Sequence, residues 1–226
     1  EEVILQDYKE DKDLKIQIEI YKYHEIFKKQ IELLGRRVLE GEKIPHSEKI
    51  ISIFQPFVEL INKGKRNVEI GKKVAITTNK SNLIVDWQIC NKETDQETII
   101  PIVDRLLSKY KIKSISVDKG YSSKSNKELL SLFIKDVIMP KKGKLNKIEK
   151  EEEKTSTFKR YKNRHNAIES NINELEHRGL NKCYDRTENN FKRYISLACV
   201  AYNLHKIGRL LNIKKEKKEI IKKQAA

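Results

Sequence analysis

Two carboxylates in this chain are placed where folded elements could hold them. Asp118 directly follows the apolar run 112–117 and precedes Lys119 and a glycine, so it lies where a buried strand gives way to a turn. Glu169 lies on the strongly helical segment 160–169. Carboxylate oxygens are the hard ligands that Mg²⁺ prefers in proteins. Acidic ligands at the centre of a basic chain favour metal-assisted chemistry on a phosphodiester.

The charge of the chain points to a polyanionic partner. Lys and Arg number 48 against 33 acidic residues, which gives a formal net charge of +15. Such an excess favours nucleic acid, through contacts with phosphates and the release of counterions. A Lys- and Ile-rich composition can also reflect an A/T-rich genome, so charge alone does not decide between these readings.

Composition also indicates the cellular compartment of the protein and the size of its hydrophobic core. The 226 residues, 38% of them hydrophobic, can support one sizeable domain. The cysteines Cys90, Cys183 and Cys199 are widely spaced, which argues against a disulfide framework or a zinc site and favours a reducing cytoplasm.

No apolar run approaches the roughly 20 residues that cross a bilayer, and no secretory signal opens the chain, so we expect a cytoplasmic protein without membrane contact. Because the sequence starts with Glu1 rather than Met, we expect a further N-terminal part.

The first part of the chain predicts a helix followed by strands. Apolar residues three and four apart predict an amphipathic helix over 14–39, within a helical lead-in over residues 1–48. Three strands are expected over 49–54, 68–78 and 83–89, with a turn at 79–82. We expect these strands to form an antiparallel meander.

The middle of the chain alternates helical and strand patterns. Helices over 94–110 and 124–133 alternate with strands over 112–117 and 136–139, which is typical of crossover connections. Together with the meander, this order predicts an α/β fold with one mixed five-stranded sheet flanked by helices.

The last part predicts long helices around a charged segment. Residues 141–156 read as an exposed charged insertion, and helices are expected over 157–177 and 188–211. The core domain would thus span 49–212, and residues 213–226 would form a basic tail that frays or moves.

Short motifs recur in a fixed order along nearly the whole chain. They are GEKIP at 41–45, SIF at 52–54, KGK at 63–65, VEIG at 68–71, DKGY at 118–121, MPKKG at 139–143, AIES at 167–170, LEHRGL at 175–180 and AYNLH at 201–205. By their order and spacing the chain resembles the DDE-type insertion-sequence transposases, and the ISNCY group in particular.

This resemblance implies a ribonuclease-H-like catalytic core in which three carboxylates bind two Mg²⁺ ions, with Mn²⁺ as a substitute. Two ions can stabilise the attacking and leaving oxygens of an in-line displacement. Asp118 would be the second acid and Glu169 the third. The partners implied are double-stranded DNA, as element ends and target, and further copies of the same chain.

The first acid departs from the family pattern. Relatives carry an acidic residue directly before a proline and then a His-Thr-Glu run, whereas this chain reads Gln55-Pro56-Phe57-Val58-Glu59. We place the first ligand at Glu59, which keeps the negative charge but lies four residues later, past the expected strand. If Gln55 holds the ligand position instead, one anionic ligand is lost and this copy is inactive.

Each candidate also has a plainer interpretation. Asp118 could serve only to form the turn before Lys119, and Glu169 could be a solvated helix residue. Glu176, two turns further along the same helical face, competes with Glu169 as the third acid.

Basic residues near these acids could hold the DNA backbone. Phosphate contacts of this kind position a protein on a duplex without reading its sequence. The alternatives are an ordinary solvated loop and, for the arginine, a surface ion pair. The candidates are Lys119, Lys141, Lys142, Lys144 and Arg164.

The sequence therefore predicts the catalytic domain of a transposase that cleaves DNA and transfers the strand. Two alternatives stay open. One is an inactive remnant that still binds DNA, and the other is a nuclease on the same fold.

Overall fold

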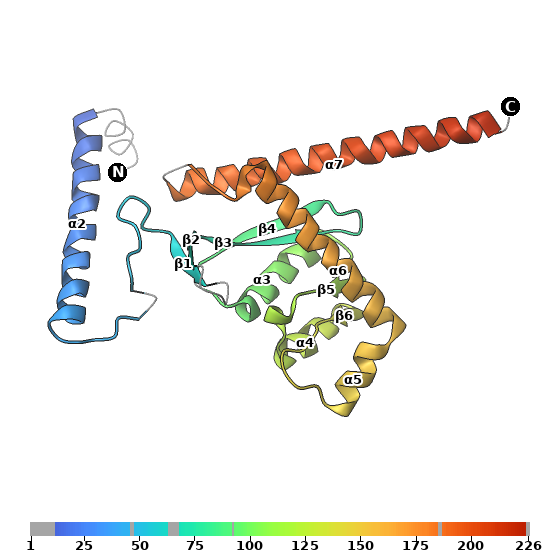
Figure 1. Ribbon diagram of the computed structural model, residues 1–226, viewed down its shortest axis with the longest axis horizontal. Helices are drawn as coiled ribbons and strands as arrows, with labels where there is room; N and C mark the ends of the chain where they lie inside the picture. Colours follow the sequence, from blue (N-terminus) through green and yellow to red (C-terminus); the bar gives the residue numbers. More distant parts are fainter. Residues whose placement is uncertain (1–11, 46–47, 63–67, 92, 185–186, 225–226) are drawn as a thin grey trace. The chain divides into compact units, whose positions relative to one another are not determined.

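The computed structural model describes residues 12–45, 48–62, 68–91, 93–184 and 187–224. The chain divides into two compact units, Glu1–Lys72 and Lys73–Ala226, each of which is described by itself (Figure 1). Among the described residues, no helix combines the length and the apolar character that a membrane span requires.

The first unit contains the long helix α2 (Lys12–Val38), which confirms the predicted helix over 14–39. Gly41, with φ +69°, follows the helix and turns the chain in a backbone conformation that favours glycine. Arg36 in the last turn of α2 then pairs with Glu42 at 2.6 Å and with Glu48 at 2.8 Å. These ion pairs tie the following segment back to the end of α2.

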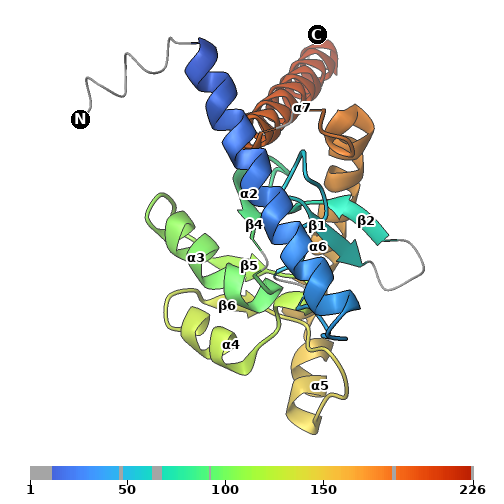
Figure 2. The same cartoon turned by 90° about the vertical axis from the view of Figure 1, so that its left-hand side faces the viewer.

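A β-hairpin completes the first unit. Strands β1 (Glu59–Asn62) and β2 (Val68–Gly71) pair antiparallel, with Glu59 opposite Gly71 (Figure 2). The strand predicted over 49–54 is wrong, because the chain there is neither strand nor helix. Val58 N–H donates to the Gln55 carbonyl at 3.1 Å, which makes a turn, and the strand begins only after it.

The predicted strand over 68–78 is two strands. It divides at Lys72, because β2 pairs with β1 while β3 (Lys73–Thr78) pairs with β4 (Ile84–Cys90). The three-stranded meander is therefore wrong, and two separate hairpins stand in its place. The apolar residues at 68, 70, 74 and 76 keep one phase on both sides of the polar run 71–73, so this pattern did not reveal that the pairing partner changes at Lys72.

The turn between β3 and β4 lies where the sequence predicts it. The Asn79 side-chain oxygen accepts from Ser81 N–H at 2.9 Å and from Leu83 N–H at 3.0 Å. Asn82 has φ +59°, a left-handed conformation that asparagine tolerates better than most residues.

The alternating middle of the second unit confirms the predicted order. Helix α3 (Asp95–Leu107) leads to β5 (Ser114–Ser116), and helix α4 (Lys124–Ser131) leads to β6 (Asp136–Ile138). β5 and β6 pair in parallel, with Ile115 opposite Val137, as a crossover through a helix requires.

The described strands form three two-stranded sheets, β1–β2, β3–β4 and β5–β6. The fold is thus mixed α/β, and the strands in the described part of the chain do not show the single five-stranded sheet. β3 and β5 each have one edge without a partner strand among the described residues.

Three apolar clusters of described residues hold the second unit together. One joins α3, α4, β5 and β6, a second joins the β3–β4 hairpin to the C-terminal helices, and a third joins the hairpin to α3 through Ala75, Cys90, Ile102 and Leu106. The first includes Ile99, Val103, Val117, Leu130 and Ile134. The second includes Ile84, Leu175, Ile195, Cys199 and Tyr202.

The charged insertion over 141–156 contains a helix that the sequence analysis missed. In α5 (Lys147–Lys154), Asn146 and Glu149 form a capping box, with both side chain to backbone distances at 2.8 Å. The Asn-x-x-Glu spacing was a readable start signal. Charge alone does not oppose a helix, since Lys and Glu are good helix formers.

The first C-terminal helix agrees with the predicted 157–177 to within two residues, whereas the second runs further than the predicted 188–211. α6 (Ser156–Leu175) continues into the irregular turn η2 (Glu176–Leu180), and α7 (Glu188–Gln224) follows. α7 extends through the stretch predicted as a basic tail, and its end projects away from the β3–β4 hairpin (Figure 1). Residues 225–226 lie outside the described part.

Asn203 of α7 holds the start of β4. Its side-chain oxygen accepts from Ile84 N–H, and its amide donates to the Ile84 carbonyl, both at 2.8 Å. We expect Asn203→Leu to lower the free energy of unfolding by about 2–4 kcal/mol, because it leaves two backbone groups of a buried residue without partners. Urea denaturation measures this. Asn212→Leu, at an exposed position of the same helix, is the control, and an equal loss there would refute the role of the two hydrogen bonds.

Candidate active site

Asp118 lies at the end of β5, where the strand becomes a turn. Val117 is buried, and its N–H donates to the Ile138 carbonyl at 3.1 Å, so strand-like pairing continues to the residue before Asp118. The Asp118 carboxylate accepts from Lys119 N–H at 2.7 Å and opens the short helix η1 (Lys119–Tyr121). One hydrogen bond uses only part of the capacity of a carboxylate, which has about four lone-pair positions. Asp118 is exposed and can accept further ligands.

The turn that carries Asp118 packs closely on α3. A side chain at Gly120 would collide with the Asp95 carboxylate, which itself pairs with Lys73 at 2.9 Å. Burial raises the pKa of the neighbouring Tyr121 to about 12, and the charge of Asp95 adds to this effect. A larger residue at 120 would force the partly exposed Asp95 side chain to shift, so the close packing of this turn on α3 is favoured by glycine.

Glu169 is held by α6. The helix starts at Thr155, whose hydroxyl accepts from Phe158 N–H at 3.3 Å, and it buries Phe158 and Leu175. Further along the helix, Asn171 accepts from the Tyr202 hydroxyl of α7 at 2.8 Å. These contacts fix α6 against the rest of its unit and leave Glu169 exposed.

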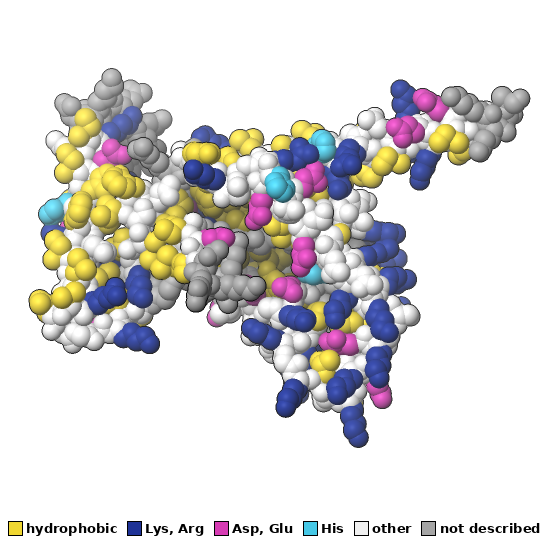
Figure 3. All heavy atoms as spheres, in the orientation of Figure 1, with side chains coloured by type: hydrophobic (Ala, Val, Ile, Leu, Met, Phe, Trp, Pro, Cys, Tyr) yellow, Lys and Arg dark blue, Asp and Glu magenta, His cyan; other side chains and the backbone are white. Residues whose placement is uncertain are grey.

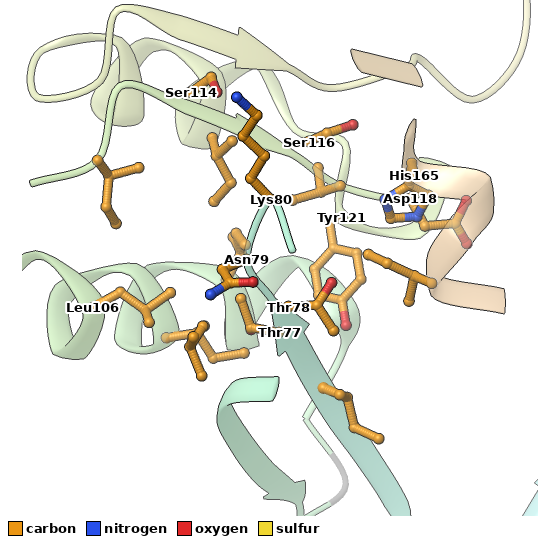
Figure 4. Close-up of a pocket in the computed structure, with 18 of the residues that line it drawn as sticks. Thr77, Thr78, Asn79, Lys80, Leu106, Ser114, Ser116, Asp118, Tyr121 and His165 are labelled. Carbon is orange, nitrogen blue, oxygen red and sulfur yellow. The ribbon is translucent and has the colours of Figure 1, made fainter. Parts of the chain in front are cut away.

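A cavity of ≈ 570 Å³ brings Asp118 and Glu169 together. Its walls come from β3, α3, the stretch from Lys111 to Asp118, and α6. Figure 4 shows Asp118, His165 and Tyr121 toward one end of the cavity and Leu106 toward the other. Most of the lining is apolar and includes Ile76, Val85, Ile99, Ile102, Leu106, Ile115 and Ile172.

The structure separates Glu169 from its competitor. Glu169 lines the cavity that Asp118 also lines, whereas Glu176 does not. Within the described ranges, neither Asp118 nor Glu169 has a Lys, Arg or His partner at ion-pair distance. Both carboxylates therefore keep their charge available to a cation.

His165 also lines the cavity, although the sequence analysis does not single it out as a site residue. It lies one turn before Glu169 on α6, and its Nδ1 is buried without a hydrogen-bond partner in the part of the chain that the structure describes. The spacing of four residues between His165 and Glu169 places both on one helical face. That spacing was the only signal in the sequence.

Glu59 belongs to the first unit and is already paired there. Its carboxylate lies 2.6 Å from Lys72 Nζ, with the side chains only 14% and 6% exposed. Glu59 opens β1, so the expectation that it lies past a strand end is wrong. Gln55 lies in the preceding turn, where its N–H donates to the Ser52 hydroxyl at 3.1 Å.

The metal-ligating side chains of the cavity meet only part of what a hard divalent cation requires. The cavity offers two carboxylates, the ligand type that Mg²⁺ prefers. Among the residues described, however, no three His, Cys, Asp or Glu side chains converge closely enough to hold a metal ion. Glu59, the third predicted ligand, belongs to the first unit, whereas Asp118 and Glu169 belong to the second.

The predicted DNA-binding residues differ in their surroundings. Lys119, Lys142 and Lys144 are exposed, whereas Lys141 pairs with Glu149 at 2.8 Å. That ion pair is the largest cause of the lowered pKa of Glu149. The Arg164 guanidinium lies 5.9 Å from the centre of the Tyr161 ring, so its recorded contact is a cation–π interaction. Figure 3 shows Lys and Arg side chains gathered over α5 and α6.

Residues 46–204 match the family model of the transposase DDE domain. The chain belongs to this family. Searches of curated proteins and of solved structures returned no match. The matched range contains Glu59, Asp118 and Glu169 and ends inside α7. Membership in a family of DDE transposases implies DNA as a partner, and these enzymes generally depend on divalent metal ions.

The close approach between Gly120 and the Asp95 carboxylate can be tested by substitution. We expect Gly120→Ala to destabilise the transposase domain by about 1–3 kcal/mol, because the added carbon meets the Asp95 carboxylate. Thermal unfolding measures the effect.

A second substitution separates this clash from a general cost of alanine. Adding Asp95→Ala should recover part of the loss, since the colliding atoms are then absent. Gly35→Ala, where an added carbon meets nothing within 4 Å inside α2, is the control and should be neutral or slightly stabilising. Equal losses in Gly120→Ala with and without Asp95→Ala would contradict this explanation.

Proposed function

We propose that this chain is the catalytic domain of an insertion-sequence transposase of the ISNCY group, which cleaves DNA at the ends of the element and joins the freed ends to target DNA. The observation that carries the proposal is that Asp118 and Glu169, far apart in the sequence, line one cavity with both carboxylates uncompensated. Their order along the chain, and the matched family, agree with the second and third acids of a DDE site.

The positions of the residues around the cavity indicate the role of each in metal binding or in positioning. Asp118 and Glu169 would hold Mg²⁺, or Mn²⁺ in its place, on the polar side of the cavity. When bound, the ions would supply charge stabilisation at the attacking and leaving oxygens of a phosphodiester. Gly120 and Tyr121 keep Asp118 in place through their packing on α3, and the contact between Asn171 and Tyr202 keeps α6 in place. The apolar walls limit the access of water to the inner part of the cavity.

The first acid remains at Glu59 in this proposal. Lys72 neutralises Glu59, so the carboxylate must leave Lys72 before it can serve a cation. The competing assignment is Gln55, which carries no charge. Under that assignment the chain is an inactive remnant that binds DNA through its basic surface.

We also propose that the catalytic core is ribonuclease-H-like. The cavity lies between Ile76–Lys80, which belong to β3 and its turn, and the stretch that contains β5. Among the described strands, β3 and β5 each have a partner on one edge only. An extended apolar segment placed between them would join two hairpin strands and two parallel strands into one mixed five-stranded sheet. Edge strands with unpaired backbone groups readily accept such an addition.

DNA is the proposed partner of the basic surface. Lys119, Lys142 and Lys144 are exposed and would contact phosphates, while Lys141 and Arg164 would have to exchange their present contacts with Glu149 and Tyr161. Because phosphate contacts release counterions, we expect affinity for duplex DNA to fall steeply with added salt.

Metal binding tests the two cavity carboxylates. In a calorimetric titration with Mn²⁺, we expect Asp118→Asn and Glu169→Gln each to weaken binding by at least about tenfold, since each removes one anionic ligand. Glu176→Gln is the matched control, because Glu176 lies on the continuation of the same helix but outside the cavity. Undiminished binding in both cavity variants would exclude them as ligands.

Two substitutions test whether residue 59 or residue 55 occupies the position of the first acidic ligand. If Glu59 is the ligand, Glu59→Gln should weaken Mn²⁺ binding as Asp118→Asn does, and Gln55→Asp should change little. If Gln55 occupies the ligand position, the unaltered chain should bind Mn²⁺ poorly and Gln55→Asp should raise its affinity by about tenfold or more.

Assays on DNA separate the three functions. Metal-dependent cleavage followed by strand joining supports the transposase. Hydrolysis without joining supports a nuclease, and salt-dependent binding without cleavage supports the inactive remnant.

A further inference from the structure

Helix α5 is attached to the second unit through charge and not through an apolar face. None of its residues is buried, and its one apolar side chain, Ile148, is 77% exposed. Figure 1 shows α5 at the end of the second unit, beside α6. Helices in globular proteins are usually held by an apolar stripe that packs against the core. Polar contacts must therefore hold α5 in place.

Three glutamates of α5 pair with lysines from three different elements. The pairs are Glu152 with Lys127 of α4 at 2.6 Å, Glu149 with Lys141 in the turn after β6 at 2.8 Å, and Glu153 with Lys162 of α6 at 3.8 Å. At about 100° per residue, positions 149, 152 and 153 share one side of the helix. We call these three glutamates the acidic face of α5. Lys147, Lys150 and Lys154 lie on the other side and are exposed.

The acidic face is not explained by an ordinary solvated helix. Such a helix pairs its own charges at spacings of three and four residues. Lys147 and Glu151 have that spacing, as do Lys150 and Glu153. Within the described part of the chain, however, α5 makes no ion pair between two of its own side chains. Its paired carboxylates contact lysines of the surrounding elements instead.

The acidic face carries negative charge at a density close to that of nucleic acid. Its three carboxylates are distributed over about 6 Å of helix axis, from residue 149 to residue 153. A DNA duplex carries one charge per about 1.7 Å, and each strand one per about 3.4 Å. The three lysines therefore meet on α5 the charge that a short stretch of phosphates would present.

The chain on both sides of α5 allows the helix to leave as a unit. Gly143 before it has φ +97° and open space around it, and Thr155 after it is not helical (φ −58°, ψ 146°). The Thr155 hydroxyl accepts from Phe158 N–H at 3.3 Å, so α6 begins with a cap of its own. Departure of α5 thus breaks only partly exposed ion pairs, which are individually weak and are weakened further by salt.

We propose that the acidic face of α5 covers Lys127, Lys141 and Lys162 in place of nucleic acid phosphates, and that DNA displaces α5 to reach these lysines. Lys141 is already a proposed DNA contact, whereas Lys127 and Lys162 are added by this inference. It rests on the proposed function, because DNA is the polyanion that it names. It adds a control on that function, since a chain whose lysines are covered binds DNA less tightly than one whose lysines are free.

Neutralising the acidic face tests the competition. We expect Glu149→Gln, Glu152→Gln and Glu153→Gln together to raise the affinity of the whole chain for duplex DNA by at least about tenfold at low salt, because the lysines are then free. The logarithm of the affinity should also fall more steeply with the logarithm of salt, by about 0.9 for each freed lysine that contacts a phosphate. Glutamine at 149 keeps the capping box of α5. Fluorescence anisotropy at several salt concentrations measures both effects.

A matched control separates competition from net charge. Glu151→Gln, Glu216→Gln and Glu219→Gln together change the net charge by the same amount, at exposed positions without an ion-pair partner within the described ranges. The gain in affinity should be clearly smaller in this control. Equal gains in both variants would mean that net charge alone sets the affinity, and the proposal would be overturned.

Distances between spin labels test the displacement itself. Labels at Ile148→Cys on α5 and Leu132→Cys at the end of α4 leave the three ion pairs intact, and both positions are exposed. Cys183 is replaced by Ser, because Cys90 and Cys199 are buried. Dilution with unlabelled chain keeps the measured distances within one molecule. We expect the distance distribution to shift and broaden on addition of duplex DNA, and also at high salt without DNA.

The outcomes separate this proposal from the proposed function. If the chain binds DNA while the label distances stay unchanged, α5 is not displaced, and the proposal falls while the proposed function stands. If neither the unaltered chain nor the variant with the neutralised acidic face binds DNA, both fall.

Discussion

The contact between Tyr202 and Asn171 links the parts of the second unit on which the candidate active site depends. Tyr202 is 1% exposed and Asn171 is 3% exposed, and the tyrosine hydroxyl donates to the asparagine side chain at 2.8 Å. The same hydroxyl lies 3.2 Å from the Asn82 carbonyl in the β3–β4 turn. Burial raises the pKa of Tyr202, so the hydroxyl remains a donor under ordinary conditions. One buried group thus ties α6, two residues from Glu169, to both α7 and the hairpin.

Asp118 is positioned by interactions of its own neighbours in the sequence. This explains why the turn that carries it could be predicted from the sequence. A buried strand residue, a capping carboxylate and a glycine follow one another at 117, 118 and 120, so the turn can be inferred from neighbouring residues alone. Glu169 could be assigned to a helix from periodicity, but its presence in the same cavity as Asp118 depends on packing between distant elements. The absence of Glu176 from that cavity depends on the same packing and could not be read from the sequence.

The errors in the predicted fold share a physical cause. Apolar content made 49–54 resemble a strand and alternation made 68–78 resemble a single strand, but a strand exists only through its hydrogen-bonded partner. Partners are not encoded in the segment itself. The opposite error affected α5, where high charge was taken as a sign of an exposed loop. The end of α7 is helical over the stretch that was expected to be either a fraying helix or a mobile tail. Helices satisfy their backbone groups internally, so charged residues with high helix propensity can form them on an exposed surface.

The ion pair of Glu59 with Lys72 opposes the proposed role of Glu59 as the first acidic ligand. The pair between Glu59 and Lys72 is largely buried, and separating such a pair without replacement costs roughly 3–5 kcal/mol. A cation that recruits Glu59 must supply that free energy in addition to the ordering of the other ligands. Position 55 carries an amide, which brings no negative charge to a cation. Asp118 and Glu169 alone hold two negative charges, which is weak coordination for two divalent ions. If Glu59 is the first acid, as proposed, activity requires that the binding of DNA phosphates and metal together outweighs the ion pair between Glu59 and Lys72.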